Sequence, residues 1–326
     1  MRPIPRVGLL VAAAVIVITA WAALAFPTNA GTNGPSTPAV AAAAKAKADL
    51  NTLTGPKAAV LGVVEGITEY LPISSTGHLL VAERLLDIGQ GKDKNATDTF
   101  TVVIQIGAIL AVLGIFRKRF VTMAEGLVGR SAEGRNTLIA LVVAFIPAAV
   151  VGQLFGDTIK KHLLEPWPVV AAWAVGGVVI LAFVAQQGRF RAVTTSVGAI
   201  TIRQAAIIGI AQTLALWPGT SRSLVTILAA IALGMSLQVA VEFSFLLGFV
   251  TLSAATAYEL LKNGKEMFDV FGVVNPLVGT VIAGIAAFAA VKWMLSWLQT
   301  RPLTVFGWYR LGAAALGAVL ILAGSI

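Results

Sequence analysis

Residues 58–80, AAVLGVVEGITEYLPISSTGHLL, place ionisable and hydroxyl side chains inside an otherwise apolar run. Glu65 and Glu69 are four residues apart, so on a helix they share one face, about one turn apart. Two like charges in an apolar setting repel each other and are costly to desolvate, so we expect a cation between them, either a metal ion or an arginine. Pro72 then ends the helix and frees backbone groups beside the serines that follow. Polar groups beside a broken helix at membrane depth indicate a functional site.

The composition of the whole chain agrees with a membrane setting. The chain has 326 residues, of which 57% are hydrophobic and 12% are charged, and its mean hydropathy is +0.87. Soluble domains carry roughly 25% charged residues, so the composition predicts a protein with several membrane spans. The net charge of +9 comes from basic residues between apolar runs, where cytoplasmic loops carry them, and indicates no nucleic-acid partner. The chain has no cysteine, so a metal site needs oxygen ligands, which favours Mg²⁺ or Ca²⁺.

Three parts follow one another along the chain. Residues 1–26 form a membrane anchor or a signal segment, and we favour the retained anchor although Ala23-Leu24-Ala25 resembles a cleavage site. Residues 27–55 are an Ala/Pro/Gly-rich linker, and residues 56–326 are the membrane domain. After a polar loop over 86–99, apolar spans are predicted near 100–116, 136–156, 168–186, 237–261, 273–298 and 304–325.

A second interrupted stretch, residues 205–223, aligns with the first. The offset is 147 residues and falls to 146 after a one-residue gap near the proline. Glu65 then matches Gln212, and the other matched pairs are Ala58 with Ala205, Ala59 with Ala206, Gly62 with Gly209, Pro72 with Pro218, and Ser75 with Ser221. Broken apolar segments in corresponding halves indicate an internal repeat whose interface carries the binding site. Repeat one covers about 56–186 and repeat two about 204–326.

Loop charge predicts the orientation of the two repeats. If each broken segment returns to its own side and the other six spans cross, one side receives an arginine-rich set: Arg117, Lys118, Arg119, Arg130, Arg135, Arg189, Arg191, Arg203 and Arg301. The loops of the other side are nearly balanced in charge, so the first side is predicted to be cytoplasmic. The expected fold is therefore an all-α polytopic integral membrane protein with two inverted repeats, each holding a re-entrant broken helix pair.

The second broken segment has the properties of an oxyanion cradle. Gly219 allows close backbone approach, a new helix N-terminus offers N–H groups, and Arg222 can grip a phosphate with two parallel hydrogen bonds. The alternative is an ordinary helix N-cap with the arginine reaching for the membrane surface. Glu242, inside an apolar span, is a candidate partner of Arg222. The candidate phosphate-binding residues are Ser74, Thr76, Gln212, Gly219, Thr220, Ser221, Ser223 and Thr226.

The first segment supplies the candidate catalytic groups. Glu65 and Glu69 on one helix face suit a hard divalent cation that bridges to phosphate oxygens. His78, three residues after Ser75, is a candidate nucleophile or proton-transfer group.

Two motifs resemble one known family. EGITEYLPISSTGHL and PGTSRSLVT are similar to two segments of the undecaprenyl-diphosphate phosphatase (bacitracin resistance) family, and the resemblance covers roughly residues 56–325. It implies a membrane enzyme that removes the terminal phosphate from a C55 polyprenyl diphosphate and so recycles the lipid carrier of peptidoglycan synthesis. Glu65 and Glu69 then match the acidic pair for a metal, Ser75 and His78 the proposed nucleophile and acid/base, and Arg222 the phosphate-binding group. Whether Ser75, His78 or an activated water attacks stays open.

The resemblance also implies a bacterial plasma membrane protein whose site faces outside. A transporter or flippase of an anionic polyprenyl lipid is the main alternative, because inverted repeats with broken helices are common in transporters. A non-enzymatic membrane scaffold is the third. The sequence leaves open which metal is used and whether the protein forms a homo-oligomer.

Overall fold

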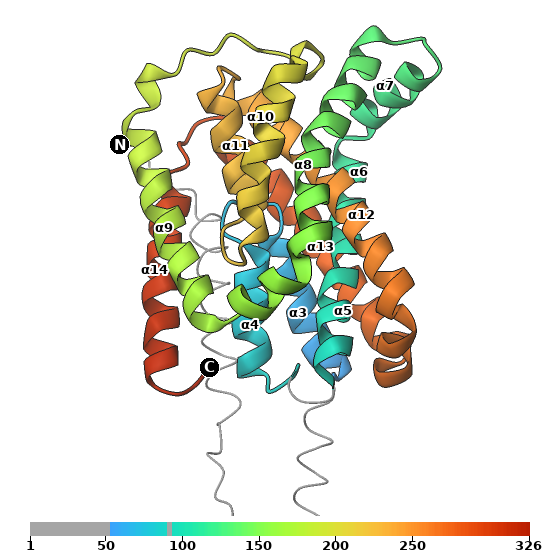
Figure 1. The fold of residues 1–326 in the computed structure, drawn as a ribbon, viewed down its shortest axis with the longest axis vertical. Helices are drawn as coiled ribbons and strands as arrows, with labels where there is room; N and C mark the ends of the chain where they lie inside the picture. The colour runs from blue at the N-terminus through green and yellow to red at the C-terminus, as the bar shows by residue number, and fades with distance from the viewer. Residues whose placement is uncertain (1–52, 90–92) are drawn as a thin grey trace, which may run out of the picture.

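The structure is a computed structural model that describes residues 53–89 and 93–326, drawn in Figure 1. The predicted anchor or signal segment, residues 1–26, and most of the linker lie outside these ranges. In the described ranges the chain folds into helices, and a single β-bridge joins Thr194 to Met235. The α-helices are α3 (Gly55–Thr68), α4 (Ser75–Leu85), α5 (Lys94–Val103), α6 (Gln105–Ile115), α7 (Arg117–Leu127), α8 (Ala132–Leu163), α9 (Pro166–Ala185), α10 (Ile202–Gln212), α11 (Arg222–Ala232), α12 (Leu237–Phe271), α13 (Val274–Trp297) and α14 (Thr304–Leu322), with short 3-10 turns η2 (Gln187–Arg189), η3 (Val197–Ala199) and η4 (Thr213–Leu216).

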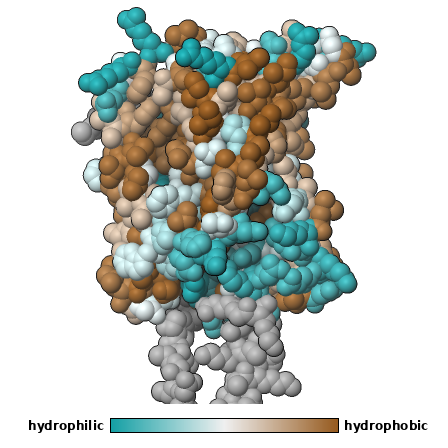
Figure 2. Space-filling model, in the orientation of Figure 1, coloured by the Kyte–Doolittle hydropathy of each residue, from teal (hydrophilic) through white to brown (hydrophobic). Residues whose placement is uncertain are grey.

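Among the described residues, six helical segments are long and apolar enough to cross a membrane. They are the continuous pair α5–α6 (Lys94–Ile115) and the helices α8, α9, α12, α13 and α14. All six coincide with predicted spans, so the all-α polytopic fold is confirmed. The predicted polar loop over 86–99 is too long, because helix α5 already begins at Lys94. The spans leave an apolar surface: Figure 2 shows hydrophobic residues over much of the visible face, with hydrophilic residues at the upper end and across the lower part.

The two broken segments fold into two helix pairs with matching geometry. Helices α3 and α10 begin 147 residues apart, and so do α4 and α11. The residue before the second helix of each pair is a serine with positive φ, 74° at Ser74 and 75° at Ser221, which is uncommon for a residue other than glycine. The predicted one-residue gap is therefore wrong. It aligned the two prolines, whereas the structure pairs Ser74, not Ser75, with Ser221.

Each helix pair packs mainly on a span from the other half of the chain. Helix α3 lies along α13, and α10 lies along α8. In Figure 1 the α3–α4 pair occupies the lower half of the molecule and the α10–α11 pair the upper half, so the two breaks meet near the middle. Helix α7 and the connection from α9 to α10, which carry the arginines that we predict to be cytoplasmic, lie together at the upper end. The inverted relation of the two halves stays a prediction that these observations favour.

Candidate active site

A cavity lies between the two helix breaks. Its volume is about 170 Å³, and it is lined by residues of both breaks and of the neighbouring spans: Glu69, Ser74, Ser75, Thr76, Gln105, Ala148, Gln212, Ala215, Leu216, Pro218, Gly219, Ser221, Arg222, Thr251 and Leu252. Eight of the predicted site residues are therefore brought to one place. Because hydroxyl, amide, carboxylate and guanidinium groups meet there inside an apolar protein, the cavity is the candidate active site.

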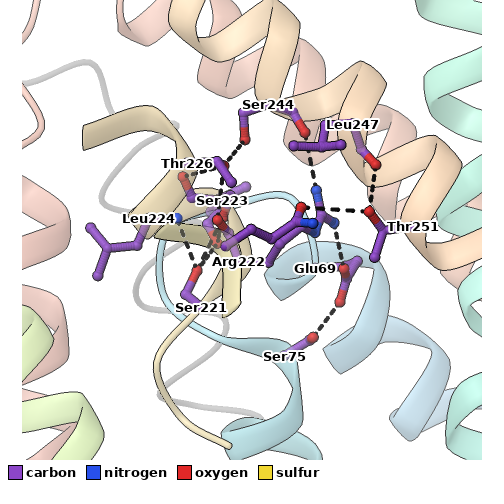
Figure 3. A network of polar contacts seen from close by, with 12 residues as sticks. Glu69, Ser75, Ser221, Arg222, Ser223, Leu224, Thr226, Ser244, Leu247 and Thr251 are labelled. Atoms are coloured by element: carbon purple, nitrogen blue, oxygen red, sulfur yellow. Dashed lines mark hydrogen bonds and ion pairs between the residues drawn. The ribbon is translucent and has the colours of Figure 1, made fainter. Parts of the chain in front are cut away.

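Glu69 connects the two halves of this site. It follows directly after helix α3, and its carboxylate is buried. One carboxylate oxygen accepts a hydrogen bond from Arg222 Nη2 at 2.8 Å, and the other accepts a short hydrogen bond from the hydroxyl of Ser75, as Figure 3 shows. An arginine from the other half, one of the two kinds of cation expected beside the acidic pair, thus lies against Glu69. The same carboxylate can hold Arg222 and accept the proton of Ser75.

The guanidinium of Arg222 lines the cavity and is held by contacts to several neighbours. Besides Glu69, it donates from Nη1 to the carbonyl of Ser244 at 3.1 Å, and its central carbon lies 5.3 Å from the centre of the Tyr70 ring. A methyl group at Gly248 would come within 1.8 Å of Nη1, so glycine is required at that point of α12. These contacts fix the direction in which the arginine can meet an anion.

The predicted pairing of Glu242 with Arg222 is wrong. Glu242 accepts from Arg119 Nε of helix α7 at 2.7 Å instead, and Arg119 also bonds Glu133 of α8 at 2.5 Å. Glu242 lies six residues before Gly248, which is about 240° around the helix, so it faces a different neighbour. Burial by itself lowers the pKa of Arg119, but these two carboxylates outweigh it and raise the pKa above its ordinary value.

The helix that follows each break begins at the cavity. Ser74, Ser75 and Thr76 line the cavity at the start of α4, and the N–H groups of a first helical turn have no acceptor within the helix. Such a turn attracts anions through its N–H groups and its dipole. Gly219, with a φ of +94°, precedes α11, and a side chain there would collide with the Val169 carbonyl at 2.7 Å. Both breaks therefore present backbone to the cavity.

Three predicted phosphate-binding residues, Thr220, Ser223 and Thr226, are not part of the cavity wall. The hydroxyl of Ser223 donates to the carbonyl of Leu71 at 2.9 Å. Thr226 donates to the carbonyl of Arg222 at 2.8 Å and pairs with the hydroxyl of Ser244 at 2.7 Å. The buried hydroxyls of Ser223 and Thr226 thus tie the second break to the first and to α12. Their direct contact with phosphate stays a prediction.

His78 lies outside the cavity wall and faces helices α9 and α14. Its Nδ1 is 2.6 Å from the carbonyl oxygen of Ser74, and its Nε2 is 2.8 Å from the hydroxyl of Tyr309. The ring also contacts Trp173 and stacks on Tyr309. Because both ring nitrogens have partners, this geometry positions the start of α4. A direct part of His78 in the reaction stays a prediction.

Glu65 is fully buried one turn before Glu69, and within the described chain neither of its carboxylate oxygens has a hydrogen-bond donor. A buried carboxylate without a partner is costly, so it attracts a proton or a cation. No cluster of three or more His, Asp or Glu side chains suited to a metal occurs in the described ranges. The donors that are present are oxygens from at most two carboxylates, and this fits Mg²⁺, which usually keeps several waters and binds substrate phosphates as well.

Two of the cavity residues with polar side chains were not predicted from the sequence. Gln105 begins α6 at an interruption of the span, and Thr251 lies within α12. Gln212, which was predicted, is 2% exposed and its side-chain N–H₂ has no acceptor in the part of the chain that the structure describes. The polar residue in the apolar run TVVIQIGAIL was a signal for Gln105. A single threonine in a long helix gives no comparable signal.

Comparison with known proteins identifies the family of the chain. The family model described as bacitracin resistance protein BacA matches residues 58–316. The chain belongs to this family. A protein of Sorangium cellulosum named undecaprenyl-diphosphatase is 42% identical over 266 residues, which cover 81% of this chain and 84% of the relative. Undecaprenyl-diphosphatase 2 of Rhodospirillum rubrum is 44% identical, with 81% and 93% covered. The undecaprenyl-diphosphatase of Nitrobacter hamburgensis is 40% identical, with 82% and 97% covered. The resemblance seen in the two motifs is thereby confirmed.

Proposed function

We propose that the chain hydrolyses undecaprenyl diphosphate, or a closely similar polyprenyl diphosphate, to the lipid monophosphate and inorganic phosphate. The observation that carries the proposal is the Glu69 carboxylate, which holds the Ser75 hydroxyl and the Arg222 guanidinium at one cavity. The names of the relatives supply the substrate. By this reaction the enzyme would recycle the carrier of peptidoglycan synthesis and confer bacitracin resistance.

Ser75 is the nucleophile that the geometry favours. Its Oγ attacks the terminal phosphorus while its proton passes to Glu69, and the bond from that phosphorus to the bridging oxygen breaks, so the lipid monophosphate leaves. Water then attacks the phosphoserine, and the Ser75 oxygen departs with a proton as phosphate is released. A carboxylate hydrogen-bonded to the hydroxyl is suitably placed to act as the base.

Charge on the phosphates is offset by groups from both breaks. Arg222 neutralises phosphate oxygens, and the first turn of α4 offers N–H donors to the developing charge. The free N–H₂ of Gln212 can donate to a further oxygen. These groups are fixed before substrate arrives, which is the condition under which such donors contribute most to rate.

A divalent cation, Mg²⁺ or Ca²⁺, would be held by Glu65 and Glu69 and would supply further positive charge against the diphosphate. The unpartnered oxygens of Glu65 support this proposal. We also propose the bacterial plasma membrane as the location, with the arginine-rich end in the cytoplasm and the cavity open to the outside, as the family resemblance implies.

The decisive experiment is phosphate release from a polyprenyl diphosphate by the purified protein in detergent. Ser75→Ala, Glu69→Gln and Arg222→Lys should each lower kcat by about a hundredfold or more. Ser296 and Glu125 are exposed and Arg301 is partly exposed, and none of the three lines the cavity. The matched controls are therefore Ser296→Ala, Glu125→Gln and Arg301→Lys, which should leave kcat unchanged.

A phosphoserine at residue 75, trapped by acid quench and found by mass spectrometry, would identify the nucleophile directly. Full activity of Ser75→Ala would refute the serine step and favour an activated water. If the wild-type protein released no phosphate in detergent, the proposed enzymatic activity would be refuted. Lipid transport between two compartments would then be the hypothesis to test.

A further inference from the structure

Arg310 is a fully buried arginine in the middle of helix α14, and nothing in the reaction above uses it. Its guanidinium donates four hydrogen bonds, all to backbone carbonyls. Nη2 bonds the carbonyls of Ala172 and Gly219, both at 2.8 Å, while Nη1 reaches Pro72 and Nε reaches Trp173, both at 3.4 Å.

Two of these carbonyls belong to the two helix breaks. Pro72 lies in the first break and Gly219 in the second, where the interrupted helices leave carbonyl groups without helical partners. In an apolar interior each such group needs a donor. One guanidinium serves both breaks and also bonds helix α9, so it joins three separate parts of the protein. Its five N–H donors in a rigid planar fork suit this task, and an ammonium group does not reproduce it.

The charge of Arg310 has no ion-pair partner nearby. Within residues 53–89 and 93–326, no carboxylate lies within 4 Å of its guanidinium, in contrast to Arg222 and Arg119. A buried cation held only by carbonyl dipoles is costly to keep. The residue therefore gains nothing from charge pairing, and what its fork supplies is a fixed distance between the two breaks.

The surroundings are shaped to keep this guanidinium in place. A methyl group at Gly176 of helix α9 would come within 2.3 Å of Nη2, so the absence of a side chain at Gly176 lets the helix approach the guanidinium. The preceding residue, Tyr309, holds His78 of the first break through its hydroxyl. Helix α14 thus contacts both breaks through adjacent residues.

We propose that Arg310 is a positioning residue that fixes the first break, with Ser75 and Glu69, relative to the second break, with Arg222. Arg310 itself does not line the cavity, and it acts through the carbonyls of Pro72 and Gly219. The proposal rests on the proposed function for its effect on rate, but its structural part, the coupling of the two breaks, is independent of any activity.

Two substitutions perturb the same guanidinium in different ways. Arg310→Met removes the fork and keeps the length of the side chain, whereas Gly176→Ala leaves Arg310 present and displaces it. The matched controls are Arg301→Met, which removes a partly exposed arginine just before α14, and Gly312→Ala, where an added methyl group meets nothing within 4 Å. Both test variants should lower kcat about a hundredfold, because a misplacement near 1 Å costs that much.

The KM should stay within about threefold, since Arg222 and the lipid-binding surface remain. The double variant Arg310→Met/Arg222→Met should have the same kcat as Arg222→Met alone, because Arg310 can no longer affect the rate once the Arg222 side chain that it positions is absent. Multiplicative losses of kcat in that double variant would overturn the proposal. So would a kcat of Arg310→Met or Gly176→Ala within threefold of wild type, or a loss of activity in these variants that merely follows the unfolded fraction in a thermal melt. A large rise in KM at constant kcat would overturn it too, by assigning Arg310 to substrate binding.

A second readout needs no activity. The chain has no cysteine, so spin labels can be attached at Thr76→Cys in the first break and Leu214→Cys beside the second. The distance distribution between the labels should be narrow with Arg310 and broader or shifted in Arg310→Met and Gly176→Ala. Unchanged distributions would refute the coupling. If the wild type released no phosphate, this measurement would still decide the role of Arg310 while the proposed reaction failed.

Discussion

Gly248 of helix α12 faces the Arg222 guanidinium, and a single methyl group at this position tests the geometry of the site. The Cβ of alanine would lie 1.8 Å from Arg222 Nη1, roughly 1.5 Å or more short of an ordinary contact between non-bonded heavy atoms. The helix backbone cannot easily retreat, so the guanidinium must move by about that much. Its 2.8 Å hydrogen bond to Glu69 would then be lost or strongly bent.

The expected effect on rate follows from this displacement. A misplacement of about 1 Å in a catalytic arrangement costs on the order of a hundredfold, so Gly248→Ala should lower kcat by about 10²-fold or more. Helix stability should not fall in parallel, because alanine favours a helix interior over glycine by roughly 1 kcal/mol. The variant should therefore lose activity while its melting temperature stays near the wild-type value.

The assay is phosphate release in detergent together with a thermal melt followed by tryptophan fluorescence. Gly264→Ala, on the same helix, is the matched control, because an added methyl group there meets side chains at ordinary contact distance only. Activity of Gly248→Ala within threefold of wild type would refute the view that the guanidinium is held in one place. Equal losses in both alanine variants would show that the helix, not the arginine, is affected.

Three further outcomes follow from the contacts. Tyr70→Phe should retain activity and be no less stable, because the buried hydroxyl of Tyr70 has no partner in the described chain. Tyr70→Leu should lower kcat several-fold, because it removes the ring beside Arg222. A loss of activity or stability in Tyr70→Phe would contradict this. Arg119→Met should lower the melting temperature and leave kcat unchanged, because Arg119 joins Glu242 and Glu133 away from the cavity. A large loss of kcat would show that these ion pairs are not independent of the cavity. A chelator should reduce phosphate release. Mg²⁺ should raise the melting temperature of the wild type but not that of Glu65→Gln. Identical rises in melting temperature in both proteins would place the cation elsewhere.

The ion pair of Glu69 and Arg222 at the centre of the site was predictable, because a charged residue in an apolar segment needs a partner of opposite charge. Glu69 in an apolar helix needs a positive partner, and Arg222 in the matching segment of the other half is the natural one. The spans and the two breaks were predictable for a similar reason, since apolar runs and prolines act locally. These signals depend on the residue itself and its near neighbours in sequence.

Other parts of the site depend on which helix faces lie together, and the sequence does not encode that locally. His78 has the chemistry of a catalytic group, but the packing of α9 and α14 surrounds its ring with Trp173 and Tyr309. Glu242 was assigned the wrong arginine because the rotation of α12 against α7 was unknown. Arg310 lies in an apolar run and was not predicted as a site residue, and its partners are backbone carbonyls, which every residue has. A list of side chains could not reveal them.

The exchange of helix packing between the two halves has a consequence for how the protein is made. Helix α3 is made about two hundred residues before its main neighbour, α13, and Arg310 follows later still. Glu69 and Leu71 of the first break lack their partners until α11 has been made, and the carbonyl of Pro72 lacks Arg310 until α14 follows. An unfinished chain therefore holds an open, unassembled pocket. Hydrolytic competence would be acquired only after α14 has been made, and a product truncated before α14 would be inert.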